Sequence, residues 1–337
     1  MNDRLRSMHV APRRPACPGR RTCLIRLAAC VAAGVAVPAR RACGQDRPRG
    51  PVLVTPFGDV EIFAADNPWN RDISRLPVHE RSATFVAAIG ADRPLHPDYG
   101  TTWQGVPSGI PFIAVGPEQQ RVPVRFEYAD ESDSGPYPIP LDAPIEGGEK
   151  STGDRHVLVI DFANKRLYET FGTHREGQGF RAGSGAIFDL TSNTLRPAGW
   201  TSADAAGLPI FPGLVRHDEV MERGEIRHAL RFTCRNTQRG CIAPATHWAS
   251  SSRNRGLPPM GLRMRLRADY PERGFPREAV VVIRALKAYG MLLADNGGDW
   301  FLSGVPSPLW NDEAVATLKR IRGRDFEAVD TGPTVMD

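Results

Sequence analysis

The stretch "HVLVIDFANKRLYE", residues 156–169, decides the class of fold. Two runs rich in β-branched, aliphatic and aromatic residues, 156–161 and 166–170, lie on either side of Asn164-Lys165. Two such runs joined by a short polar turn are typical of a β-hairpin. The chain therefore contains at least one antiparallel strand pair near its middle.

Runs of the same kind recur in both directions from this hairpin. They predict further strands at residues 110–115, 122–128, 226–233, 262–268, 291–294 and 300–303. The sequence "NGG" at 296–298 predicts the turn of a second hairpin. Helix start and stop signals are fewer, and they predict helices at 79–89, 276–289 and 312–321. We expect an α+β fold, mainly β with peripheral helices, built as an antiparallel β-sandwich or a curled sheet in one large domain over 45–337.

The first 44 residues differ in charge from the rest of the chain. They hold nine of the 43 basic residues and one of the 38 acidic residues, which leaves 34 basic against 37 acidic residues beyond them. The sequence pI of about 9.0 therefore comes from this leader. The charge of the remaining chain does not indicate a nucleic-acid partner.

The leader has the layout of an export signal. Arg20 and Arg21 precede an apolar run at 27–37, which is too short for a membrane span. The arginine pair resembles the twin-arginine export motif, and an ordinary secretory signal is the alternative. We expect residues 1–44 to be removed, and residues 45–337 to be periplasmic or extracellular and to lack a membrane span.

Cysteine positions fit export. Four of the six cysteines lie in the leader, so Cys234 and Cys241 alone would remain after cleavage. A strand at 226–233 followed by a short polar loop would bring this pair together in a hairpin. Exported proteins favour disulfides, and we expect Cys234 and Cys241 to form one.

The segment "GSGAIFDLTSNTLRPAGWTSADAAGLPIFPGLVRHDEV", residues 183–220, has no helical or strand period. A segment of this length with little regular structure is usually functional when it is ordered. We expect residues 189–219 to form an ordered loop that makes one wall of a substrate cleft.

Carboxylates in this segment suggest glycoside hydrolysis, which needs one protonated and one ionised carboxyl group in a cleft. Aromatic side chains would stack on sugar rings. The predicted catalytic residues are Asp189 and Asp204 as the pair, Glu219 in reserve, and His228 and His156 as orienting groups; the predicted substrate-binding residues are Trp200, Trp103 and Trp248. Structural roles are the alternative, with Asp204 as a helix cap and Trp200 in the core.

A cysteine mechanism is a further alternative. The stretch "QRGCIAP", 238–244, resembles the nucleophile motif of L,D-transpeptidases, which crosslink peptidoglycan through an acylated cysteine. Only Gly240, Cys241 and Ile242 match, and Ala243 stands in place of an arginine. Motifs for zinc proteases, phosphate-binding loops and dinucleotide binding are missing from the sequence, so we expect no metal and no cofactor.

Several phrases of the sequence resemble an uncharacterised family of exported bacterial proteins. They are "DNPWNRDIS", "GDRHVLVID", "RAGSGAIFDLTSN", "LRPAGWTSADAAGLPIFPGLV" and "LPPMGLRMRLRA". The resemblance implies export and one continuous domain but supplies no reaction. We expect a monomeric exported hydrolase acting on polysaccharide or cell-wall glycan, or alternatively a non-catalytic glycan-binding or cell-envelope protein.

Overall fold

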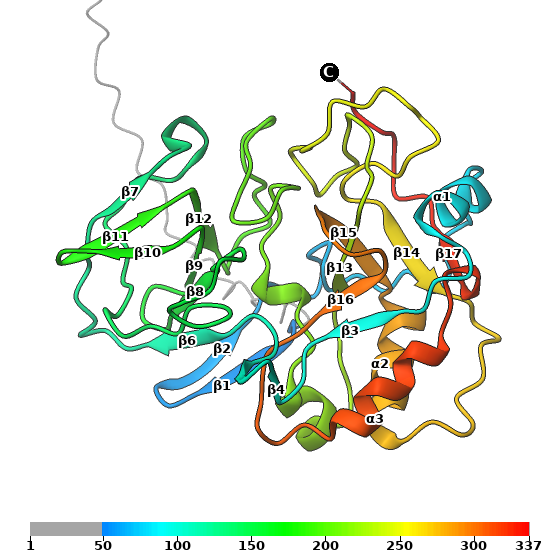
Figure 1. Cartoon of the computed structure of the whole chain (residues 1–337), viewed down its shortest axis with the longest axis horizontal. Helices are drawn as coiled ribbons and strands as arrows, with labels where there is room; N and C mark the ends of the chain where they lie inside the picture. The colour runs from blue at the N-terminus through cyan, green and yellow to red at the C-terminus, as the bar shows by residue number, and fades with distance from the viewer. Residues whose placement is uncertain (1–48, 337) are drawn as a thin grey trace, which may run out of the picture. The chain divides into compact units, whose positions relative to one another are not determined.

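A computed structural model describes residues 49–336 of the chain (Figure 1). These residues belong to one compact unit, Asp46–Asp337. The predicted export signal at 1–44 lies outside the described residues. Within the described part, no helix combines the length and the apolar character needed to cross a membrane.

The largest sheet has six strands and curls into a half-barrel. Its order across the sheet is β17, β14, β15, β13, β16 and β3. The bounds are Phe326–Ala328 for β17, Arg263–Leu266 for β14, Met291–Asn296 for β15, Leu230–Cys234 for β13, Phe301–Ser303 for β16 and His96–Asp98 for β3. The predicted α+β fold, mainly β with a curled sheet, is confirmed.

The second predicted hairpin is wrong. Strands β15 and β16 are joined by the Asn296-Gly297-Gly298 stretch, but they do not pair with each other. Strand β13 lies between them, parallel to β15 and antiparallel to β16. The turn signal at 296–298 is local and could not reveal this arrangement, because β13, which separates β15 from β16, comes from much earlier in the chain.

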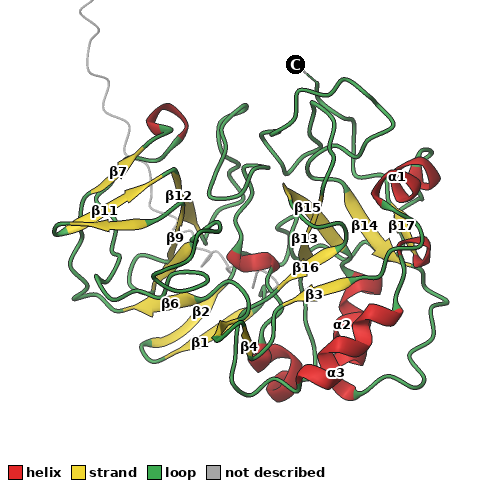
Figure 2. Cartoon of the chain, in the orientation of Figure 1, coloured by secondary structure: helices red, strands yellow, loops and turns green. Residues whose placement is uncertain are grey.

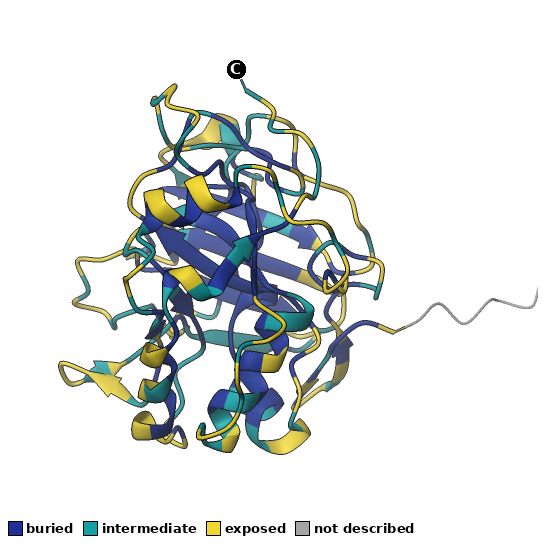
Figure 3. Cartoon of the chain, turned by 90° about the vertical axis from the view of Figure 1, so that its right-hand side faces the viewer, coloured by how far each residue is buried: buried dark blue, intermediate teal, exposed yellow. Residues whose placement is uncertain are grey.

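Helices cover the outer side of this sheet (Figure 2). They are α1 (Ser82–Ile89), α2 (Arg277–Ala288) and α3 (Asp312–Ala316). Helix α2 buries Val282 and Ile283 and keeps Arg284 exposed, so one apolar stripe packs on the sheet. Figure 3 shows the result, with buried strands inside and exposed helix faces outside.

A four-stranded sheet stands beside the half-barrel, in the order β12, β9, β8 and β6. Its bounds are Ser184–Asp189 for β12, Arg166–Phe171 for β9, Val157–Asp161 for β8 and Phe112–Val115 for β6. Strands β8 and β9 form the hairpin predicted from residues 156–169. Lys165 has a φ of 50° in its turn, the left-handed region that such tight turns use.

Smaller elements complete the fold. Three short strands form one further sheet, β10 (His174–Glu176), β11 (Gly179–Ala182) and β7 (Val124–Phe126). Two antiparallel pairs are β1 (Val52–Thr55) with β2 (Gly58–Glu61) and β4 (Thr102–Trp103) with β5 (Val106–Pro107). Short helical turns lie at Ala129–Glu131, Phe211–Gly213, Asp218–Arg223, Thr317–Arg320 and Gly323–Asp325.

Candidate functional site

A cavity of about 670 Å³ opens at the free edge of the half-barrel. Its walls come from β3, from the β4–β5 hairpin, from the loop that carries Glu146 and from α3. Three carboxylates from distant parts of the chain, Asp98, Glu146 and Asp312, line it together. Asp312, at the start of α3, is exposed and accepts the backbone N–H of Thr101 at 2.9 Å, so Asp98 and Glu146 are the pair considered below. We call it the Asp98–Glu146 cavity.

Asp98 lies on strand β3. It is the edge strand and pairs in parallel with β16, which places Asp98 opposite Ser303 and His96 opposite Phe301. Side chains of a strand alternate between faces, so His96 and Asp98 point to the same side. The ring of His96 stacks on that of Phe301 with centroids 4.0 Å apart, which fixes this end of the strand.

Glu146 lies in the loop before β8. Tyr137 and Ile139 anchor this loop by burial against the four-stranded sheet. The Glu146 carboxylate lies 2.6 Å from Nδ1 of His156, and the Glu146 backbone N–H donates to the His156 carbonyl at 3.0 Å. The His156 ring is buried, and its Nε2 lies 3.1 Å from the Ala203 carbonyl oxygen. Glu146 is thus held on one side and open to the cavity on the other.

The pKa values of the two carboxyl groups move in opposite directions. Solvent reaches the Asp98 side chain, but the concave wall surrounds it with protein atoms and partly desolvates it. This desolvation raises the pKa of Asp98, and the charge of Glu146 raises it further. Burial also acts to raise the pKa of Glu146, but the contact with His156 outweighs it and lowers that pKa. The surroundings therefore disfavour the charged form of Asp98 and favour the charged form of Glu146.

His156 carries positive charge at neutral pH. Burial acts to lower its pKa, but the Glu146 carboxylate outweighs burial and raises the pKa to about 9. The histidine therefore acts as a fixed cation behind Glu146.

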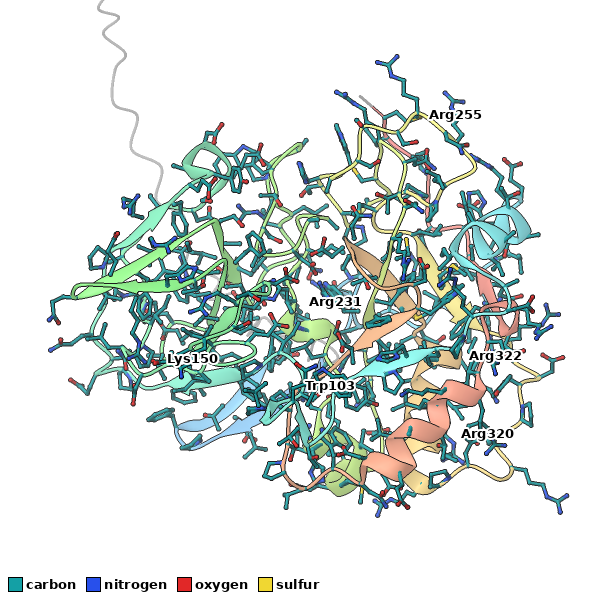
Figure 4. All side chains as sticks on the ribbon, in the orientation of Figure 1. Trp103, Lys150, Arg231, Arg255, Arg320 and Arg322 are labelled. Carbon is teal, nitrogen blue, oxygen red and sulfur yellow. The ribbon has the colours of Figure 1, made fainter. Side chains whose placement is uncertain are left out.

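Arg231 on β13 lies between the two large sheets (Figure 4). Its guanidinium donates to both carboxylate oxygens of Asp204, at 2.8 and 2.7 Å, and to the Ser303 hydroxyl at 2.6 Å. Asp295 on β15 lies 3.6 Å from the same guanidinium. Burial and the Asp204 charge raise the pKa of Asp295 to about 7. Because Ser303 pairs with Asp98, this cluster supports the strand that bears the cavity carboxylate.

Glu169 on β9 is a second buried carboxyl group near this cluster. Its oxygens accept hydrogen bonds from the backbone N–H groups of Ile210 and Phe211, at 2.9 to 3.0 Å. Burial raises the pKa of Glu169 to about 7 despite these bonds. It ties the long loop after β12 to the four-stranded sheet.

Trp103 is the one predicted aromatic residue that lines the Asp98–Glu146 cavity. It is 69% exposed, unusual for tryptophan. The β4–β5 hairpin turns through Gln104 and Gly105, both with positive φ, and Trp103 stands directly before this tight turn. Trp200 and Trp248 lie elsewhere: Arg196 covers the Trp200 ring, and His247 stacks on Trp248.

The predicted carboxylate pair does not line this cavity. Asp189 is exposed at the end of β12, where it accepts the N–H and hydroxyl of Thr191 in a turn, and these bonds lower its pKa. Asp204 is buried in its ion pair with Arg231. The structure therefore brings Asp189 and Asp204 into different environments and assigns each a structural contact.

Glu219 and His228 form a separate buried cluster. The Glu219 carboxylate lies 3.0 Å from Nε2 of His228 and 2.9 Å from the Arg216 guanidinium. Burial acts to raise the pKa of Glu219, but the charges of Arg216 and His228 outweigh it and lower that pKa. Of the predicted orienting groups, only His156 contacts a carboxylate of the cavity.

The predicted disulfide is not present: Cys234 and Cys241 are both free, buried thiols. Cys241 does not return beside β13 in a hairpin. Its backbone bridges to Met260 and Val335 instead, so the expected geometry does not form. Burial raises the pKa of the Cys234 thiol to about 12 and also raises that of Cys241. Neither thiol has the exposed, thiolate-favouring surroundings of a nucleophile.

Sequence reasoning did not single out Asp98, Glu146 or Arg231. Asp98 sits in "HPDYG" and Glu146 in "IEGGEK", which carry no motif. Asp98 is positioned by the pairing of β3 with β16, some 200 residues later, and Glu146 lies in a loop outside both strands, so no local pattern links the two carboxylates. Within residues 49–336, no group of three or more His, Cys, Asp or Glu side chains is placed to hold a metal ion.

Comparison of the chain with protein-family models, with curated proteins and with solved structures gives no match. The candidate site is therefore defined by its own geometry: Asp98 and Glu146 in one cavity wall, the buried His156 ring behind Glu146, and the exposed Trp103 in the same wall.

Proposed function

We propose that this protein is an exported glycoside hydrolase that acts on polysaccharide. In this proposal Asp98 is the general acid and Glu146 is the base or nucleophile. The observation that carries it is the placement of Asp98 and Glu146 in the wall of one solvent-open cavity, with the buried His156 ring 2.6 Å behind the Glu146 carboxylate. The opposed pKa directions of the two carboxyl groups support it. Glycoside hydrolysis needs this division of roles between two carboxyl groups.

Export rests on the sequence of the leader and on the resemblance to exported bacterial proteins. The cavity volume of about 670 Å³ falls in the range of ligand sites, and it suits a short stretch of sugar units. Trp103 offers a flat apolar face to a pyranose ring. His156 keeps Glu146 ionised and fixes its orientation.

The test is whether the protein hydrolyses any member of a panel of neutral and cell-wall polysaccharides. Hydrolysis is measured as the release of reducing ends. Asp98→Asn and Glu146→Gln should each lower turnover at least about 100-fold, the low end for a positioned acid or base. Matched controls are Asp92→Asn and Glu149→Gln, whose side chains are 83% and 71% exposed and do not line the cavity. The controls should keep wild-type turnover.

A non-catalytic glycan-binding protein is the second candidate, and the exposure of Trp103 favours it specifically. Binding without hydrolysis, abolished by Trp103→Ala and unaffected by Asp98→Asn, would replace the first proposal by this one. No binding and no hydrolysis over the panel would reject both.

A further inference from the structure

Arg263 on β14 is a buried cation with no carboxylate partner in the described part of the chain. It is 2% exposed. Its guanidinium donates to three carbonyl oxygens, those of Tyr289 at 2.8 Å, Pro68 at 2.7 Å and Arg71 at 3.3 Å. Burial, with the nearby charge of Arg71, lowers the pKa of Arg263 to about 9. A buried charge without a counter-charge is costly.

Arg265, on the same strand, is a second buried arginine with which the contacts of Arg263 can be compared. It lies two residues further on, so both side chains point to the same face of β14. Arg265 also donates to carbonyl oxygens, of Ile73, Ser74 and Leu76, but it has in addition the carboxylate of Glu327, 3.0 Å from its Nε. Arg263 has the carbonyl contacts and lacks the carboxylate.

Arg263 is also one of the residues that line a second cavity, of about 410 Å³. The polar part of its wall comes from Arg263, Arg71, Thr331, Asp66 and Asn193. The Thr331 hydroxyl is buried and has no hydrogen-bond partner among residues 49–336. Arg71 is exposed, and within the same residues it forms no ion pair. Apolar side chains make the rest of the wall, among them Ile73, Leu76 and Leu292. We call this the Arg263 cavity.

We propose that the Arg263 cavity binds a small organic carboxylate with an apolar body. The carboxylate would accept from Arg71, Arg263 and the Thr331 hydroxyl, and would supply the counter-charge that Arg263 lacks. The apolar body would contact Ile73, Leu76 and Leu292. This site is separate from the Asp98–Glu146 cavity, and none of its lining residues is shared with it.

The test uses the full chain with octanoate as the probe, 1-octanol as its uncharged analogue and inorganic phosphate as an anion without an apolar body. Calorimetric titration and the rise in Tm with ligand concentration measure binding. Octanoate should bind, and Arg71→Gln and Thr331→Val should each weaken it about tenfold or more. The matched control is Arg75→Gln, at an exposed arginine outside the cavity wall.

Equal binding of 1-octanol and octanoate would overturn the proposal, because the arginines would then contribute nothing. Phosphate binding as tight as octanoate binding would overturn the claim that the ligand needs an apolar body. The cavity would then be a general anion site. Absence of octanoate binding, or binding unchanged in both Arg71→Gln and Thr331→Val, would reject it. None of these readouts uses hydrolysis, so the result does not depend on the proposed glycosidase activity.

Discussion

Arg231 holds both carboxylate oxygens of Asp204, through Nε at 2.8 Å and Nη2 at 2.7 Å, and the two side chains are almost fully buried. This pair joins the half-barrel to the long loop after β12. Its geometry is that of a strong bidentate ion pair. In this pair Asp204 is bound to Arg231 and does not line the Asp98–Glu146 cavity.

Asp204→Asn should therefore lower stability. Removal of Asp204 leaves Arg231 with Asp295, 3.6 Å away, in place of a bidentate partner, so the cost in the free energy of unfolding should be below the roughly 3–5 kcal/mol of a fully uncompensated buried charge. Urea denaturation measures it. The double variant Asp204→Leu with Arg231→Met should recover part of the loss, because neither member of the buried pair is then charged. Wild-type stability with turnover lost at least about 100-fold would instead support the catalytic role that the sequence suggested.

Activity should follow a bell-shaped pH profile if Asp98 and Glu146 act as proposed. Activity requires ionised Glu146 and so rises with pH through a pKa held below the ordinary 4.5. It requires protonated Asp98 and so falls as pH rises through a pKa above the ordinary 3.8. Turnover measured from pH 3 to 8 should be greatest in acid and decline toward neutral pH. An optimum above neutrality would contradict these roles.

His156→Gln should move the acid limb of that profile to higher pH. The charge of His156 counteracts the burial of Glu146, so its removal raises the pKa of Glu146. Loss of turnover at every pH without movement of the limb would mean that His156 only supports the loop. His174→Gln is the control, because that histidine lies on β10, outside the cavity wall.

Stability should fall as pH rises from about 4.5 to about 7. Burial raises the pKa of Glu169 to about 7 from an ordinary 4.5, so the folded state binds a proton that the unfolded state has lost within this window. Asp295, with its pKa also raised to about 7, acts in the same direction. Urea midpoints at pH 5 and pH 8 measure the effect. Glu169→Gln should reduce the difference between the two, whereas Glu149→Gln at an exposed site should leave it unchanged.

Peptide mapping after alkylation of the denatured, unreduced protein should find both Cys234 and Cys241 modified. In the native protein the two thiols should react slowly, because both are buried and their pKa values are raised. A peptide that links the two cysteines would contradict the free thiols and restore the disulfide predicted from their spacing.

Local patterns in the sequence predicted local structure well. The turn at Asn164-Lys165 and the flanking strands lie within fourteen residues, and the hairpin is present as predicted. Helix α2 also falls within its predicted range. The residues that start and stop a helix lie within about one turn of its ends, so they can be recognised locally. The turn at 296–298 failed for the opposite reason, since β13 enters from a distant part of the chain.

The candidate site depends on such distant contacts. Asp189 looked like a site residue because it follows an apolar strand, but the pattern Asp-Leu-Thr also allows the turn to Thr191 that the structure contains. Asp98 and Glu146 meet only because β3 pairs with β16 and because burial of Tyr137 anchors the loop before β8. Of the predicted residues, His156 and Trp103 lie at this site, and neither could be distinguished from a core or surface residue by sequence alone.

The position of β13 between β15 and β16 has a consequence for synthesis of the chain. Strand β13 ends at Cys234, and its two partners begin at Met291 and Phe301, so β13 leaves the ribosome well before either partner exists. Both of its edges then stay unpaired, and the parallel pairing with β15 must close a long loop. A nascent chain that stops short of Ser303 therefore leaves at least one edge of β13 unpaired, and other chains can pair with it. The half-barrel can assemble only when translation is nearly complete.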